Sequence, residues 1–141
     1  MKFSFHLDTE SGVPVYRQII DQIAGGVATG SLQQGQQLPT VRQLAVDLSV
    51  NPNTVIRAYR ELEIRGVLVT QQGLGTFIGT GQISRDEREH QRALDQLVTE
   101  VLARAGHLGF SAREVLDRME AVLADGVPPN TRAAKSKKES M

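Results

Sequence analysis

Two short helical patterns separated by a three-residue turn constrain the fold of this chain more than any other feature. The first pattern follows Thr40, which forms a capping-box pattern with Gln43. The second begins at Asn51, because the residue before a proline avoids the α region and Pro52 suits the first helical position. Such short helices joined so tightly have the proportions of a helix-turn-helix unit. The apolar face of the first helix consists of Leu44, Ala45 and Leu48.

A strand–turn–strand pattern follows the second helix directly. That helix is predicted to run to about Arg65, and Gly66 ends it. Residues 67–72 and 76–79 have strand patterns, and residues 73–75 between them form a glycine-bearing turn. A two-stranded ribbon at this place makes the unit a winged helix. The second helix is expected to bury Val55, Ala58, Tyr59 and Leu62.

The N-terminal residues predict a short strand and a first helix. Alternation at Phe3, Phe5 and Leu7 indicates a half-buried strand. Pro14 suits the first position of a helix that Gly30 ends. The apolar side of this helix comprises Val15, Ile19, Ile20, Ile23 and Val27. Two central glycines, Gly25 and Gly26, lower its intrinsic propensity, so it needs tertiary support.

Residues 80–125 read as an acidic pair of helices. Capping-box patterns at Ser84 and Ser111 begin the two helices, at about residue 85 and after residue 111, and Gly106 and Gly109 separate them. Each helix carries an apolar stripe that so small a segment cannot bury alone, which predicts a two-fold homodimer. The alternative is that the stripes pack on the winged helix of the same chain. The residues predicted to form the dimer interface are Leu94, Leu97, Val98, Val101, Leu102, Val115, Leu116, Met119, Val122 and Leu123.

The chain is therefore expected to be mainly α with a small β-wing. Residues 1–79 form the winged helix-turn-helix, and residues 80–125 the helical dimerisation segment. Residues 126–141 have no large apolar residue between Val127 and the terminal Met141, and we expect a disordered tail there.

Polar and basic side chains lie where a winged helix meets DNA. The second helix of such a unit enters the major groove with its N-terminus first, so its first turns face base edges. Asparagine matches the N6/N7 edge of adenine and arginine the O6/N7 edge of guanine, so Asn53 and Arg57 are expected to read sequence. Arg42 lies in the helix that usually crosses the phosphates, and glycines allow the wing to approach closely. The residues predicted to bind DNA are Arg42, Asn51, Asn53, Thr54, Arg57, Arg60, Gly73 and Gly75.

Each of these signals also has a simpler structural explanation. Asn51 before a proline is a helix cap whether or not DNA is present. Arg57, Arg60 and Arg65 have helical spacing to Glu61 and Glu63 and could form a solvated, ion-paired face. The wing glycines could serve the hairpin turn alone. Tyr16 is expected to be part-buried packing whose hydroxyl could reach a phosphate.

Several spaced motifs resemble the GntR family of bacterial transcription regulators, and specifically its YtrA subfamily. The resemblance covers about residues 5–79. It is carried by Pro14-Val15-Tyr16-Arg17-Gln18-Ile19, Leu38-Pro39-Thr40-Val41-Arg42-Gln43-Leu44-Ala45, Val50-Asn51-Pro52-Asn53-Thr54-Val55, Ala58-Tyr59, Glu61-Leu62-Glu63, Gly66 and Gly73-Leu74-Gly75-Thr76-Phe77-Ile78.

The resemblance implies that the residues matching Arg42, Asn51, Asn53, Thr54 and the wing glycines lie at the DNA. One departure concerns the positions of Pro52 and Ile56, which carry arginine in many GntR proteins of other subfamilies. Pro52 cannot hydrogen-bond a base and Ile56 cannot bind a phosphate, so DNA affinity has to depend more on Arg57 and Arg60.

Composition excludes several other classes of function. The chain has no cysteine, so it has no disulfide framework, thiol nucleophile or cysteine-ligated metal. It has no membrane-length apolar run and no signal peptide, and we expect a cytoplasmic protein. Its sixteen basic and sixteen acidic residues balance, so a nucleic-acid interface has to be local. The histidines His6, His90 and His107 lie far apart and lack metal-ligand spacing.

These observations favour a homodimeric regulator that binds a palindromic operator in double-stranded DNA. Repression is favoured over activation, because blocking a promoter requires no surface for contacting polymerase. No nucleophile, acid–base pair in a cleft or phosphate loop indicates an enzyme, and no cofactor is expected. The segment is too small to enclose a ligand within one chain, but a small effector could bind at the dimer interface. The main alternative is a winged helix that contacts another protein, which an apolar exposed face on its second helix would favour.

Overall fold

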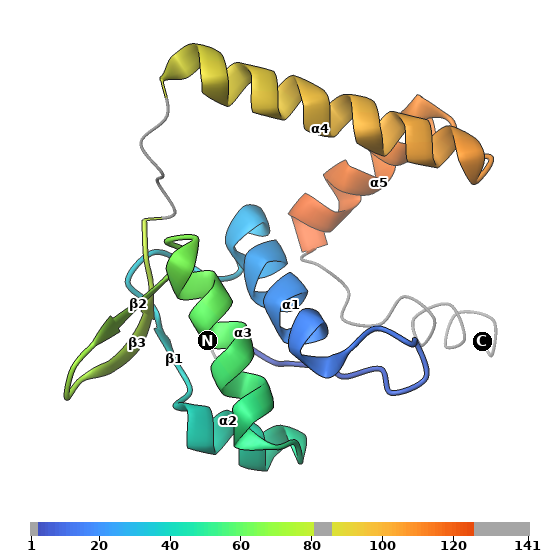
Figure 1. The fold of residues 1–141 in the computed structure, drawn as a ribbon. Helices are drawn as coiled ribbons and strands as arrows, with labels where there is room; N and C mark the ends of the chain where they lie inside the picture. Colours follow the sequence, from blue (N-terminus) through green and yellow to red (C-terminus); the bar gives the residue numbers. More distant parts are fainter. Residues whose placement is uncertain (1–2, 81–85, 126–141) are drawn as a thin grey trace. The chain divides into compact units, whose positions relative to one another are not determined.

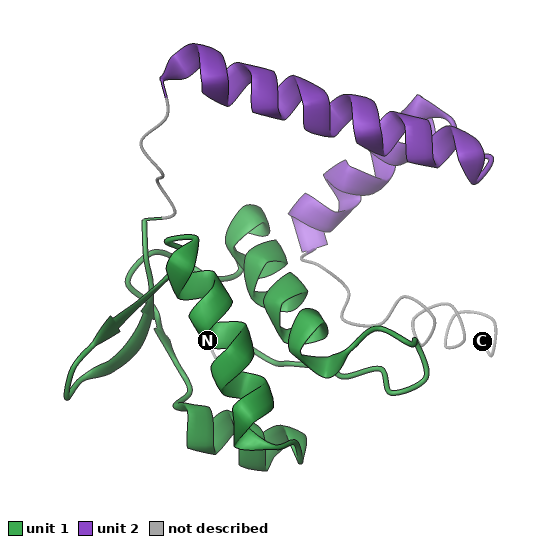
Figure 2. Ribbon diagram, viewed as in Figure 1, with its two compact units in different colours: residues 1–81, 127–141 green, residues 82–126 purple. Residues whose placement is uncertain are grey.

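The computed structural model describes residues 3–80 and 86–125, which form two compact units (Figures 1 and 2). The described helices and strands follow the order α1(Val15–Thr29), β1(Gln37–Leu38), α2(Val41–Leu48), α3(Pro52–Ile64), β2(Leu68–Gln71), β3(Gly75–Ile78), α4(Glu87–His107) and α5(Ala112–Asp125). The first unit holds α1 to β3, and the second holds α4 and α5. The tail predicted for residues 126–141 lies outside the described residues.

The first unit is a winged helix, as predicted. Three helices pack beside a small antiparallel sheet with strand order β1-β3-β2 (Figure 1). In its register, Leu68 of β2 faces Ile78 of β3, and Leu38 of β1 faces Thr76 of β3. The sequence predicted β2 and β3 but not β1, whose two residues are too few for an alternating pattern.

One apolar core joins the elements of this unit. All three helices contribute to it, and the positions predicted to be buried on α1 and α3 are buried or half-buried. Its buried members are Ile19, Ile20, Ile23, Leu32, Leu38, Leu44, Ala45, Val55, Ala58, Tyr59, Leu62, Leu68 and Ile78. This core fixes α3 against α1 and α2, so the exposed side of α3 has a defined position in the unit.

The strand predicted at the N-terminus is wrong, although its burial alternates as expected. Phe3, Phe5 and Leu7 pack against the core from an extended segment that pairs with no strand in the described chain. Glutamine amides of α1 take the place of a neighbouring strand. Gln18 accepts from the Asp8 N–H at 2.8 Å and donates to its carbonyl at 2.8 Å. Gln22 pairs with the backbone of residue 6 in the same manner, at 2.9 and 2.6 Å.

The boundaries of α1 agree with its sequence signals to within one residue. Pro14 is the N-cap and not the first helical residue, and its carbonyl accepts from the Arg17 N–H at 3.1 Å. Gly30 ends the helix in the left-handed region, with φ 83°. Both termini are therefore specified by local residue type.

The two adjacent glycines of α1 have opposite surroundings, and we expect opposite effects of Gly25→Ala and Gly26→Ala. A Cβ atom at Gly25 would meet nothing within 4 Å, so this alanine should stabilise the fold by about 0.5–1 kcal/mol. At Gly26 the Cβ would lie 2.9 Å from Cδ1 of the buried Leu32. Overpacking there should outweigh the helix propensity and destabilise by about 1 kcal/mol.

Urea unfolding of the two alanine variants and the parent measures this difference. The glycines are neighbours in one helix, so each variant is the matched control for the other. Equal stabilisation by both substitutions would show that Leu32 moves aside without loss.

The second unit consists of α4 and α5. The predicted start of the first helix needs correction, because Asp86 is the N-cap of α4 and accepts from the Glu89 N–H at 3.0 Å. Ser84, the predicted cap, lies outside the described residues. The helix also continues through Gly106, and the chain turns at Gly109, which has φ 85°. The capping box at Ser111 is confirmed: its Oγ accepts from the Glu114 N–H at 3.1 Å.

Most of the apolar side chains of the second unit are exposed. On α4, Leu97 and Val98 are 55% and 49% exposed, and on α5, Met119 and Leu123 are 48% and 62% exposed. Ala105 is the only buried residue among the described residues of this unit. No helix in the described part of the chain is long and apolar enough to span a membrane.

Candidate nucleic-acid interface

Side-chain caps fix the two helices of the helix-turn-helix. Thr40 Oγ1 accepts from the Gln43 N–H at 3.1 Å, and Gln43 Oε1 accepts from the Thr40 N–H at 3.1 Å, which confirms the predicted capping box. Asn51 Oδ1 accepts from the Asn53 N–H at 2.8 Å and caps α3, with Pro52 in its first turn. Between them, Ser49 takes the left-handed conformation with φ 56° and turns the chain sharply.

Capping occupies part of the hydrogen-bonding capacity of Asn51. Its Oδ1 holds the start of α3, whereas its amide N–H₂ group is exposed and donates to no described residue. A paired contact with adenine needs both an acceptor and a donor. The cap uses one of the two lone pairs of Oδ1, so Asn51 keeps one acceptor site and its amide donors.

A buried tyrosine ties the middle of α3 to the start of α2. The Tyr59 hydroxyl donates to the carbonyl oxygen of Pro39 at 2.8 Å. Burial raises the pKa of Tyr59 far above its ordinary value, so the phenol keeps its proton and stays a donor. This bond and the packing of Ala58 and Leu62 hold the exposed face of α3 in a set direction.

The exposed face of α3 is mixed in chemistry and slightly hollowed. Asn53 and Arg60 lie opposite the buried side, and their side chains are exposed. Ile56 and Ile64 are also exposed, by 37% and 79%. A shallow hollow on this face is lined by Asn53, Ile56, Arg57, Arg60, Glu61 and Ile64. The face thus presents amide, guanidinium and apolar groups to a binding partner.

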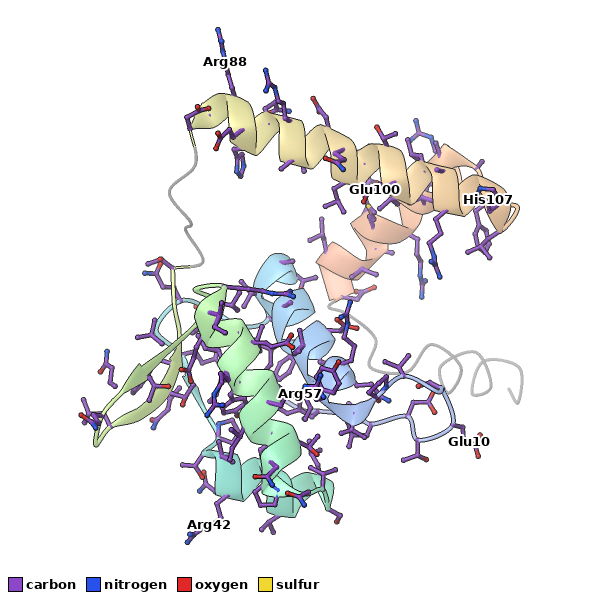
Figure 3. The ribbon with its side chains drawn as sticks, viewed as in Figure 1. Glu10, Arg42, Arg57, Arg88, Glu100 and His107 are labelled. Carbon is purple, nitrogen blue, oxygen red and sulfur yellow. The ribbon has the colours of Figure 1, made fainter. Side chains whose placement is uncertain are left out.

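The arginines of this region differ in what they contact. The guanidinium carbon of Arg57 lies 3.8 Å from the centroid of the Tyr16 ring on α1 (Figure 3). Arg65 forms a 4.0 Å ion pair with Glu61. Glu63 accepts a 2.7 Å hydrogen bond from Thr70 of β2. Within the described residues of the first unit, the arginines that form no ion pair are Arg42, Arg57 and Arg60.

The ion-paired face considered from the sequence therefore forms at Arg65 and not at Arg57 or Arg60. Arg42 projects from α2 away from the rest of the unit (Figure 3). Thr54 is half-buried, and its N–H donates to the Asn51 carbonyl at 2.9 Å. Polar side-chain groups that bond no described residue lie on Asn51, on Asn53, Arg57 and Arg60 of α3, and on Arg42 of α2.

The wing depends on both of its glycines. Gly73 and Gly75 have φ values of 81° and 130°, which disfavour other residues. Gln37 of β1 closes the turn from the side, because its Nε2 donates to the Leu74 carbonyl at 3.1 Å. A Cβ at Gly75 would lie 2.7 Å from that nitrogen. Leu74 is 67% exposed at the tip of the wing.

Sequence patterns missed two contributors to this region. Gln37 supports the wing, and Tyr16 stacks on Arg57, but each contact joins elements that are distant in the sequence. The described residues contain no group of three or more histidine, cysteine, aspartate or glutamate side chains that could hold a metal ion.

Comparison with known proteins gives consistent matches. Residues 15–78 match the family model described as bacterial regulatory proteins, gntR family. The HTH-type transcriptional regulator YhcF of Bacillus subtilis is 36% identical over 121 residues, which cover 83% of this chain and 96% of that protein. The HTH-type transcriptional repressor YtrA of the same organism is 30% identical over 119 residues, covering 84% of this chain and 92% of that protein.

Solved structures agree with these matches. The crystal structure of a transcriptional antiterminator from Listeria monocytogenes EGD-e is similar with a TM-score of 0.68 and 30% sequence identity. The similarity covers 89% of this chain and 94% of that one, so it includes α4 and α5 as well as the winged helix.

Proposed function

The chain belongs to the GntR family of bacterial transcription regulators, in its YtrA subfamily, and we propose that it is a homodimeric repressor of a palindromic operator. As a member of this family it is a DNA-binding transcription regulator and not an enzyme. The observation that carries the proposal is the fixed face of α3 beside an exposed wing, where Asn53, Arg57 and Arg60 are exposed together with Ile56 and Ile64. The YtrA relative is a named repressor, which supports the same direction of regulation here.

In the proposed complex, α3 enters the major groove and the wing lies against the adjacent backbone or minor groove. Asn53 reads base edges, because its side-chain amide is exposed and bonded to no described residue. Arg42 and Arg60 bind phosphates, and both lack an acidic partner in the described chain. The remaining proposed contacts are made by Asn51, Thr54, Arg57, Gly73 and Gly75.

The proposed dimer forms through the exposed stripes of α4 and α5. Side chains such as Val98 and Leu116, 49% and 44% exposed, would gain hydrophobic stabilisation in a two-fold interface. A two-fold dimer also presents two recognition helices, which matches two half-sites of a palindrome. A small effector would bind at this interface if one exists. Such a regulator would act in the cytoplasm, where the bacterial chromosome lies.

Selection of bound duplexes from random DNA tests the proposal directly. We expect an inverted repeat to be enriched, with both half-sites needed for full affinity. Enrichment of a single half-site would contradict the palindrome, and no enrichment would contradict sequence reading. Transcription from promoters that carry the repeat is then compared in cells with and without the protein. Repression predicts higher transcription in cells that lack the protein, and activation predicts lower transcription.

The affinity for that operator should fall only moderately with salt. Arg42, Arg57 and Arg60 in each of two protomers allow at most about six phosphate contacts, so the log–log slope should be no steeper than about −5. Titration of labelled duplex at several salt concentrations measures it. A steeper slope would indicate further cationic contacts, and deletion of residues 127–141, which include three lysines, would locate them.

A further inference from the structure

The stack between Tyr16 and Arg57 joins the first turn of α1 to the second turn of α3. The Arg57 guanidinium lies over the ring at 3.8 Å, a distance at which cation and ring attract each other. Tyr16 is half-buried, and its ring packs against the core. Arg57 is exposed, so its contact with this ring is what restricts the position of its guanidinium group. No carboxylate in the described residues competes for Arg57.

This contact places Arg57 on the α1 side of the exposed face of α3. At 100° per residue, Arg57 lies about 40° around the helix from Asn53. Ile56 lies about 60° from Asn53 in the opposite direction. On the side of α3 that carries Ile56, Glu63 accepts a hydrogen bond from Thr70 of β2. The wing therefore lies beside this side of the helix. Arg57 therefore lies on the α1 side of Asn53, and Ile56 lies on the side of the wing.

The flanks of a helix in the major groove face the phosphates that line the groove, whereas its middle faces base edges. A guanidinium stacked on a ring has one face covered, but its N–H groups lie in the plane and remain free at the edge. Held in this way, it loses less conformational entropy when it binds an anion than a free arginine does.

We propose that Tyr16 is a positioning residue for DNA binding, and that it holds the Arg57 guanidinium ready for a backbone phosphate on the α1 side of the groove. This rests on the proposed function and refines it, because the sequence alone favoured base reading by Arg57. Arg57 then contributes affinity and salt dependence, and Asn53 contributes sequence preference.

A double-mutant cycle in DNA affinity tests the pair. Arg57→Ala should weaken the selected operator and a random duplex by the same factor and reduce the salt slope by about 1 per protomer bound. Tyr16→Leu should weaken both duplexes by about two- to five-fold and Tyr16→Phe by almost nothing, because phenylalanine keeps the ring. In the Arg57→Ala background, Tyr16→Leu should have no further effect.

Two more variants make the cycle specific. Arg65→Ala removes the arginine at the C-cap of α3, which already pairs with Glu61, and it should leave affinity nearly unchanged. Arg57→Lys keeps the charge without the planar stack and should bind between the parent and Arg57→Ala. Thermal unfolding of every variant shows whether the fold is intact. If Tyr16→Leu does not fold, Tyr16→Met, which also removes the ring but keeps a long apolar side chain, takes its place in the cycle.

Three results would overturn the inference. Equal losses for Tyr16→Leu with and without Arg57 would mean that Tyr16 acts independently of it. Equal losses for Tyr16→Phe and Tyr16→Leu would mean that the hydroxyl itself contacts DNA. A changed preference at a single base pair in Arg57→Ala would mean that Arg57 reads a base. Each of these leaves operator selection by the parent protein intact, whereas failure of the proposed function abolishes that selection.

Discussion

The double substitution Val98→Asp with Leu102→Asp is expected to convert the proposed dimer to monomers at micromolar concentration. The two side chains lie one turn apart on α4 and are 49% and 41% exposed in a single chain. In the dimer they would be covered, and a buried carboxylate without a partner is strongly unfavourable. Two such charges should raise the dimer dissociation constant at least about a thousand-fold, which corresponds to ~4 kcal/mol. Sedimentation velocity measures the shift.

A matched control distinguishes loss of the interface from damage to the helix. Thr99→Asp with Ala103→Asp introduces the same charges at the same spacing, on the polar side of α4, where both residues are exposed. This control should remain dimeric. If the Val98 and Leu102 variant also remains dimeric, the interface lies elsewhere in the chain. If it is monomeric, its operator affinity should fall towards that of a single half-site.

Asn53→Ala is expected to remove most of the preference at one position of each half-site. The Asn53 side chain is exposed in the first turn of α3 and forms no hydrogen bond with a described residue. The substitution should therefore leave the stability of the fold unchanged. Loss of a paired contact with a base should lower affinity for the preferred sequence by about 1–3 kcal/mol, or roughly 5- to 150-fold per half-site. Random duplexes should bind as before.

Competition binding against single-base variants of the operator measures the base preference at each position. Arg42→Ala provides the contrast, because loss of a phosphate contact should weaken every sequence about equally and reduce the salt slope by about 1 per contact. If Asn53→Ala keeps the complete profile, α3 does not dock with this face towards the bases. A profile change in Arg42→Ala would give it a role in base reading.

The caps of the helix-turn-helix could be predicted because they are local. The side chains of Thr40 and Gln43 each accept a hydrogen bond from the other residue's backbone N–H. Asn51 caps α3 by accepting from the N–H of Asn53, two residues away. The start of α4 was harder, because Ser84 and Asp86 each precede a glutamate by three residues. Asp86 forms the observed cap. Local patterns therefore locate a helix terminus well only when a single candidate is present.

The missed features depend on contacts between distant residues. The alternation of Phe3, Phe5 and Leu7 correctly indicated one-sided burial, but a pattern of burial does not name the hydrogen-bonding partner. That partner is a pair of glutamine side chains on α1. The strand β1 has only two residues, and it forms because Gln37 and Leu38 meet β3. Neither pairing has a signal in the sequence around it.

In the candidate site too, the sequence predicted the local features but not the contacts between distant residues. Residue types and helical spacing were enough to place Asn53, Arg57 and Arg60 on one exposed face of α3. They could not show that Arg57 stacks on Tyr16, or that Arg65 is already neutralised by Glu61. Side chains of this length reach several neighbours, and only the packed structure selects among them.

In the proposed dimer, the exposed stripes of α4 and α5 would make the cellular concentration of this regulator a control variable. A unit that gains its apolar contacts from a second copy is stabilised by mass action. While monomers predominate, the concentration of dimer rises with the square of the total protein. Operator occupancy would then respond to synthesis and dilution more steeply than that of a monomeric regulator. A fall in protein level during rapid growth would then lower the operator occupancy of the proposed repressor, without any inducing molecule.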